Sequence, residues 1–81
     1  MIITDTMKTH YHDHLIQKGE KQSFIDECMG FVDIFAVVLE NNPNVPDAIP
    51  VFIENINPRG LGAVKSAWGF LDDYAKFIEI G

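Results

Sequence analysis

The sequence predicts an all-α protein, a compact single domain of four helices that occupies residues 1–81. Apolar side chains recur at steps of three and four residues, which is the period of one face of an α-helix. Glycine, asparagine and proline separate the segments that have this period, as expected for helix ends and turns. A chain of 81 residues has room for one domain, and no repeat or low-complexity segment divides it.

The first helix is predicted at residues 5–18, where apolar side chains follow each other at intervals of four residues. Thr4 or Asp5 can cap its start, because a short oxygen-bearing side chain accepts from the free amides of a first turn. Gly19 is the expected end of this helix.

The second helix is predicted at residues 23–41, the most apolar segment of the chain. Ser23 is its expected cap, and an Asn-Asn-Pro-Asn sequence ends it. The main alternative is a β-strand at residues 31–39, because the phenylalanine and valine pairs in this stretch have high β propensity.

The third helix is predicted at residues 47–56. Asp47 is the expected cap, and Pro50 is expected in the first turn, where a missing N–H costs nothing. Isoleucine and phenylalanine then recur with helical spacing, which favours a helix over a loop and strand.

The fourth helix is predicted at residues 58–80, with Asn57 as its cap and Pro58 at its first position. Glycines inside this segment indicate close packing against a neighbouring helix. The apolar residues with the most regular helical spacing predict the face that meets the core: Leu61, Val64, Trp68, Leu71, Ala75 and Ile78.

The charge balance limits the partners that can be expected. Twelve acidic and six basic residues give a net charge of −6, and the bases form no cluster. Direct binding of nucleic acid is therefore not expected, because phosphates would be repelled. Cys28 is the only cysteine, no apolar run is long enough to span a membrane, and the N-terminus does not resemble a secretory signal. We expect a soluble cytoplasmic protein without a membrane partner or a cofactor.

A row of carboxylates is the most informative pattern in the chain. Asp26, Asp33 and Glu40 follow each other at intervals of seven residues in the apolar second helix. Seven residues are almost two helical turns, so the three acids share one edge, which Met29 and Val37 flank. Charges bordered by apolar side chains can give a protein partner both electrostatic attraction and contact area.

Two other patterns suggest chemistry less strongly. His10, His12 and His14 alternate, but on a helix His12 points away from the other two, so a metal site is the alternative rather than the main hypothesis. No sequence motif of a nucleophile, a phosphate loop or a carboxylate pair is present. We therefore expect no enzymatic activity.

The last helix has a wide apolar arc that includes Phe70 and Phe77. These aromatic residues either pack against a second neighbouring helix or lie outward, where they would bind a partner or form a homodimer.

Together these patterns predict a small acidic binding module without chemistry of its own. We expect it to occupy a basic surface of another protein, such as a nucleic-acid-processing protein, as an inhibitor or regulator. In size and charge it resembles phage-encoded antagonists of host defence, a resemblance that spans no motif. The alternatives are a metal-binding protein that uses His10, His12 and His14, and a structural subunit that forms a homo-oligomer.

Overall fold

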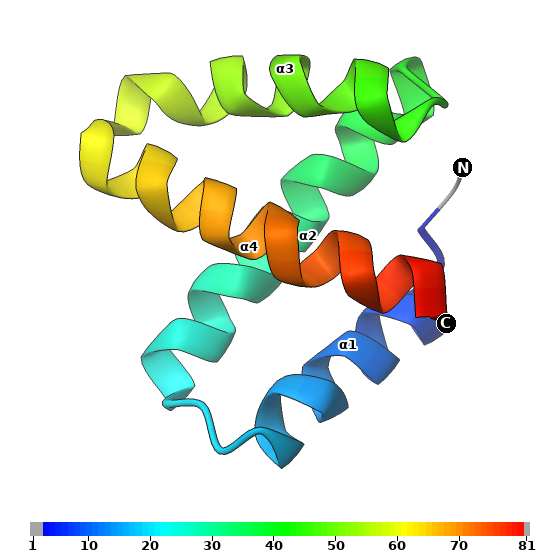
Figure 1. Cartoon of the computed structure of the whole chain (residues 1–81), viewed down its shortest axis with the longest axis vertical. Coiled ribbons are helices and arrows are strands. Elements are labelled where there is room, and N and C mark those ends of the chain that lie inside the picture. The colour runs from blue at the N-terminus through cyan, green and yellow to red at the C-terminus, as the bar shows by residue number, and fades with distance from the viewer. Residues whose placement is uncertain (1–2, 81) are drawn as a thin grey trace.

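The computed structural model describes residues 3–80, with the side chains of residues 3–77. These residues form the α-helices α1 (Asp5–Gln17), α2 (Gln22–Asn41), α3 (Val45–Ile56) and α4 (Leu61–Ile80), together with a short 3-10 helix, η1 (Asn57–Arg59). In Figure 1, α1 and α3 lie at opposite ends of the view, while α4 crosses between them in front of α2. The predicted all-α fold with four helices is confirmed.

The predicted alternative of a strand at residues 31–39 is wrong, because this segment lies in the middle of α2. Its buried phenylalanines and valines recur with helical spacing, and burial of that face outweighs their β propensity. Within the described residues, no helix is both long enough and apolar enough to cross a lipid bilayer.

The first helix begins as predicted. Thr4 is its N-cap, and the Thr4 hydroxyl accepts a hydrogen bond from the Met7 amide at 3.2 Å. The prediction of Ser23 as the cap of α2 is wrong, because α2 begins at Gln22 with Lys21 as its N-cap. The Gln22 amide group donates to the Asp26 carboxylate at 2.9 Å, a contact one turn apart that favours the earlier start.

The start of α3 also lies earlier than predicted. Asn44 is the N-cap, and Pro46 occupies the first turn, where its fixed backbone angle suits a helix start. Asp47 is therefore a first-turn residue instead of the cap, and its carboxylate accepts from the Asn44 side chain at 3.4 Å. Pro50, predicted in the first turn, lies inside the helix on an exposed position.

The fourth helix begins later than predicted. Asn57 and Pro58 belong to η1 and do not start α4. Gly60 follows with a φ angle of 105°, a backbone conformation that glycine adopts far more readily than other residues. This residue ends η1 and reorients the chain, so that α4 begins at Leu61.

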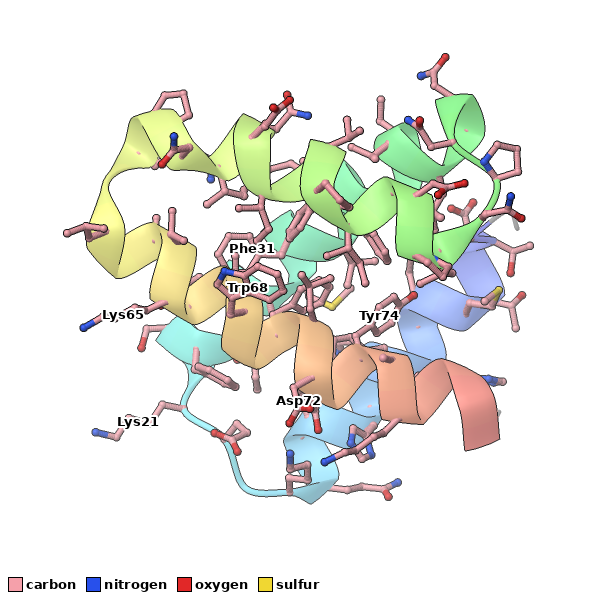
Figure 2. All side chains as sticks on the ribbon, turned by 45° about the horizontal axis from the view of Figure 1, so that its top comes forward. Lys21, Phe31, Lys65, Trp68, Asp72 and Tyr74 are labelled. Carbon is pink, nitrogen blue, oxygen red and sulfur yellow. The ribbon has the colours of Figure 1, made fainter. Side chains whose placement is uncertain are left out.

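A cluster of aromatic rings forms the centre of the core. Each α-helix contributes to it, and neighbouring ring centres lie 4.7–6.4 Å apart, mostly edge to face or tilted. Figure 2 shows Phe31 and Tyr74 between the helices. The aromatic residues that are at most 2% exposed are Tyr11, Phe31, Phe35, Phe52, Phe70 and Tyr74.

The face of α4 that meets this core differs from the prediction. Leu61 is 79% exposed and Trp68 52% exposed, whereas Phe70 and Tyr74 are buried. Leu71 belongs to both faces and is buried, while the side chain of the predicted core residue Ile78 lies outside the described side chains. The aromatic rings determine the orientation of α4, because burying them removes more apolar area from water than burying the predicted face.

The glycines within α4 do not permit close packing, contrary to the prediction. A Cβ atom added at Gly62 or Gly69 would have no neighbouring atom within 4 Å. Both glycines lie on exposed positions of the helix, where an added side chain would point into open space.

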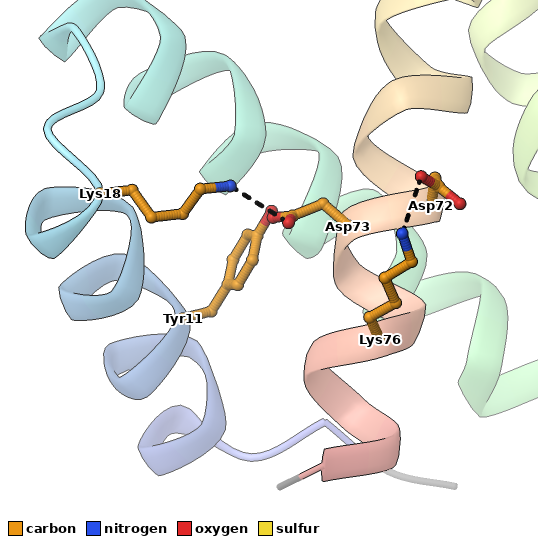
Figure 3. Close-up of polar contacts among 5 residues, drawn as sticks. All are labelled: Tyr11, Lys18, Asp72, Asp73 and Lys76. Carbon is orange, nitrogen blue, oxygen red and sulfur yellow. Dashed lines mark hydrogen bonds and ion pairs between the residues drawn. The ribbon is translucent and has the colours of Figure 1, made fainter.

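A polar contact joins the first and last helices (Figure 3). The buried Tyr11 hydroxyl donates to Asp73 Oδ2 at 3.1 Å, and Lys18 Nζ lies 3.2 Å from Asp73 Oδ1. The neighbouring Asp72 points into solvent and pairs with Lys76 one turn later, at 3.5 Å. The two adjacent carboxylates therefore differ in role, because only Asp73 fixes α1 against α4.

Candidate interaction surface

The outward side of α2 presents a row of carboxylates. Asp26, Asp33 and Glu40 are all exposed, and their spacing along one helix places them on a common edge. Neighbouring acids in this row follow each other at roughly 10 Å, given a rise of 1.5 Å per residue. The row therefore extends along most of the helix.

The three carboxylates differ in their partners within the protein. Lys8 Nζ from α1 lies 3.1 Å from Asp33 Oδ1, and Asp26 accepts from Gln22. Glu40 has no hydrogen bond or ion pair with any described side chain. One base thus offsets three acids, and the edge keeps a negative potential.

The two apolar residues that flank the row are not equally accessible. Val37 is 59% exposed, whereas Met29 is half-buried and packs against the core. Val37 lies on the outer side of α2 between Asp33 and Glu40 in sequence, so it provides the exposed apolar contact next to the acids.

A groove of about 400 Å³ adjoins one end of the row. One wall is the first half of α2, and the opposite wall is η1 with the start of α4. Gly30 and Gly62 have no side chains to fill the groove, and a Cβ at either position would contact nothing within 4 Å. The lining residues are Asp26, Glu27, Gly30, Phe31, Arg59, Gly62, Ala63 and Ser66.

Charges of both signs line this groove. Asp26 and Glu27 lie on the α2 side and Arg59 on the η1 side, yet no ion pair joins Arg59 to either carboxylate within the described residues. The Glu27 carboxylate and the Arg59 guanidinium keep their hydrogen-bonding capacity for an external group. The groove can therefore accept a side chain from a partner, with a cation favoured at the α2 wall.

Sequence reasoning missed Glu27, Gly30 and Arg59 as members of this surface. Asp26 belongs to both the row and the groove, but the groove exists only because α2 and the start of α4 lie side by side. The pairing of these helices comes from tertiary packing, for which the sequence contains no local signal. Of the two groove glycines, only Gly62 entered a prediction, which was close packing of the last helix, whereas an added Cβ at Gly62 would meet nothing within 4 Å.

The two phenylalanines predicted for partner binding do not form an outward surface. Phe70 is 2% exposed and lies in the aromatic core, so its prediction as a binding residue is wrong. Phe77 is half-buried, with its ring centre 5.3 Å from that of Tyr11 and 5.2 Å from that of His14. Both rings hold α4 against other helices of the same chain.

The three histidines lie along α1 in different environments. His10 is exposed, His12 Nδ1 lies 3.8 Å from an Asp13 oxygen, and the His14 ring stacks on Tyr11. Within the described part of the chain, no three side chains of the metal-binding types come together to hold an ion.

Buried ionisable groups lie in the core and away from the groove. Burial raises the pKa of the Cys28 thiol to about 11 and that of the Tyr74 hydroxyl to about 12. Burial also raises the pKa of Tyr11, with further contributions from Cys28 and Asp73.

No known protein family, curated protein or solved structure matches the chain. The surface of α2 therefore has to be interpreted from its own geometry.

Proposed function

We propose that the protein is a non-enzymatic binding module that occupies a basic surface of another protein. The observation that carries this proposal is the exposed row of Asp26, Asp33 and Glu40, which is only partly neutralised within the chain. The exposed Val37 beside the row supplies apolar contact area. Acids steer a basic partner toward the surface, and apolar side chains stabilise the docked complex.

The groove gives this surface an anchoring position. A lysine or arginine of the partner that enters it would meet Asp26 and Glu27, where lost hydration is offset by charge-assisted hydrogen bonds. Arginine and lysine rows are typical of proteins that bind nucleic acid. Occupying such a row would exclude the nucleic acid, and we therefore propose that the module acts as an inhibitor or regulator of a nucleic-acid-processing protein.

The experiment compares two variants that change the net charge equally. Asp33→Lys alters the centre of the row, whereas Glu54→Lys alters an exposed position of α3 outside it. Immobilised wild type and both variants are used to capture proteins from the same native cell lysate, and bound proteins are quantified by mass spectrometry. The expected result is a basic protein that wild type and Glu54→Lys retain and Asp33→Lys loses.

The captured protein then allows a kinetic test by interferometry. The wild-type association rate should fall as ionic strength rises from about 0.05 to 0.15 M, because the Debye length shrinks. Asp33→Lys should flatten this dependence, since charges at the edge of an interface act mainly on association. Equal losses from Asp33→Lys and Glu54→Lys would falsify a localised site and leave only net charge as the cause of binding.

A further inference from the structure

The two walls of the groove between α2 and the start of α4 carry opposite charges. Asp26 and Glu27 lie on the α2 wall, and Arg59 of η1 lies on the other. All three side chains are exposed, and within the described residues none of them has an ion pair. The groove therefore separates two carboxylates from a guanidinium group, and each wall lacks a counter-charge.

The wall that carries Arg59 offers further hydrogen-bond donors. Ser66 lines this wall, and its hydroxyl has no hydrogen bond with any described residue. Gly62 and Ala63 belong to the first turn of α4, where amides have no acceptor within the helix and the dipole is positive. None of the lining residues on this wall is acidic. The wall as a whole therefore favours an anion.

The groove offers a ligand little apolar contact. Phe31 is only 2% exposed, and Gly30 and Gly62 have no side chains. Charge and hydrogen bonding therefore decide what binds there. The volume of about 400 Å³ lies in the range of sites that enclose small ligands, about 300–1,000 Å³, and gives room for two charged groups together.

We propose that this groove binds a cation and a carboxylate that one segment of a partner presents together. The inference rests on the proposed function, because the cation is the lysine or arginine that anchors the partner. The cation contacts Asp26 and Glu27, while the carboxylate accepts hydrogen bonds from Arg59. A segment with a cation alone leaves Arg59 facing a like charge, so the pair is selected over a purely basic segment.

Two sources can supply this carboxylate, and short peptides distinguish them. Acetyl-Gly-Gly-Arg amide presents only a cation. The same peptide with a free carboxylate represents a C-terminal base, and acetyl-Gly-Arg-Glu amide places an acidic side chain next to the base. Each is titrated into isotope-labelled protein at low ionic strength, and binding is followed by nuclear magnetic resonance.

At least one of the two peptides with a carboxylate should bind at least about threefold more tightly than the cation-only peptide, as expected for an exposed ion pair. The peptide that shows this gain identifies the source of the carboxylate. Backbone signals of the groove residues should shift on binding. No binding of any peptide up to about 10 mM, or equal affinities for all of them, would overturn the inference. Equal affinities would leave the proposed basic partner intact, because Asp33→Lys tests that partner at the row.

Arg59→Gln isolates the second charge of the groove. It should abolish the gain from the carboxylate without weakening the cation-only peptide, because a like charge is removed. Lys65→Gln is the matched control, since it removes the same charge from an exposed position of α4 that does not line the groove. This control should preserve the gain. Equal losses of the gain in Arg59→Gln and Lys65→Gln would also overturn the inference.

Discussion

The two buried tyrosines differ in how their hydroxyl groups are satisfied. The Tyr11 hydroxyl donates to Asp73, while the Tyr74 hydroxyl is buried without a hydrogen-bond partner among the described residues. A hydrogen bond contributes about 1 kcal/mol to stability, and a buried polar group without one costs about 1–3 kcal/mol. Two residues of the same type in one core should therefore respond in opposite directions to the same substitution.

We expect Tyr11→Phe to lower the free energy of unfolding by about 1 kcal/mol, because it removes the contact with Asp73. Tyr74→Phe should raise the free energy of unfolding by about 1 kcal/mol, because it removes an unsatisfied hydroxyl and keeps the ring. Urea denaturation of both variants at neutral pH measures the difference. A loss of stability in Tyr74→Phe would show that its hydroxyl finds a partner in solution.

The raised pKa values predict a loss of stability at alkaline pH. Cys28 and Tyr74 are neutral when protonated, and burial raises their pKa values from 9.0 to about 11 and from 10.0 to about 12. The unfolded chain therefore loses these protons at lower pH than the folded protein does. The stabilisation is complete below pH 9 and disappears as the pH rises through 9–12.

The double variant Cys28→Ala/Tyr74→Phe isolates this effect, because it lacks both ionisable groups. Between pH 8 and pH 11 the free energy of unfolding should fall for wild type by roughly 2–5 kcal/mol more than for the double variant. Lysine deprotonation occurs in both proteins and cancels in the comparison. Parallel pH profiles for the two proteins would contradict the prediction.

The sequence predicted where the helices lie better than where they begin. Thr4 and Asp5 were the two predicted candidates for the cap of α1, and Thr4 is the cap. Several side chains compete at the starts of α2 and α3, and neither Lys21 nor Asn44, which hold the cap positions, accepts a hydrogen bond from a first-turn amide with its side chain. The helix-start preferences of neighbouring residues differ by less free energy than the packing of a whole helix contributes. Tertiary contacts therefore decide at which residue α2 and α3 begin.

The buried face of α4 could not be predicted from the spacing of its apolar residues. Apolar residues cover more than half of the helix circumference, and the most regular spacing includes Leu61 and Trp68, which are exposed. The buried side instead contains Phe70 and Tyr74, which complete a ring cluster with α1, α2 and α3. Periodicity identified a helix, but only the partner helices determine which apolar side is buried.

Pro50 gives a testable consequence within α3. It lies inside the helix on an exposed position, where the helix lacks the N–H that would bond to the Pro46 carbonyl. Pro50→Ala should restore that bond, and alanine is favoured over proline by about 3 kcal/mol in a helix interior. The unfolded chain gains conformational freedom when the proline is lost, which lowers the free energy of unfolding by about 0.4–1 kcal/mol.

Thermal denaturation should therefore show a higher melting temperature for Pro50→Ala, with a net gain of about 2 kcal/mol. Pro46→Ala is the matched control, because the first turn needs no N–H there and only the unfolded-state effect remains. It should be slightly less stable than wild type. A Pro50→Ala variant that is also destabilised would indicate that α3 depends on a proline-induced bend.

One aromatic cluster connects the four α-helices. Phe70 contacts rings from α1, α2 and α3, so no helix has a separate core. The row of Asp26, Asp33 and Glu40 could be predicted from the sequence because one regular helix sets their positions. The groove could not, since it arises between helices that are distant in sequence.

The shared core predicts a large difference between two aromatic residues on α4. Phe70→Ala should cost about 3–5 kcal/mol, a large part of the total stability of a domain of this size. Trp68→Ala removes a larger ring that is only half-buried and should cost about 1 kcal/mol. Chemical denaturation followed by circular dichroism compares the two. Similar costs would contradict the observed orientation of α4.

The contact between Tyr11 and Asp73 has a consequence for how the chain is made. The two residues lie 62 positions apart, and synthesis of that distance takes roughly 3–12 s at the usual speed of a ribosome. Throughout that time the first helix lacks its acceptor, and the phenylalanines of α2 lack the rings of α4. The apolar side of α2 therefore stays uncovered by α4 until residues 61–80 have been made, so the core cannot close while the first three helices are being synthesised.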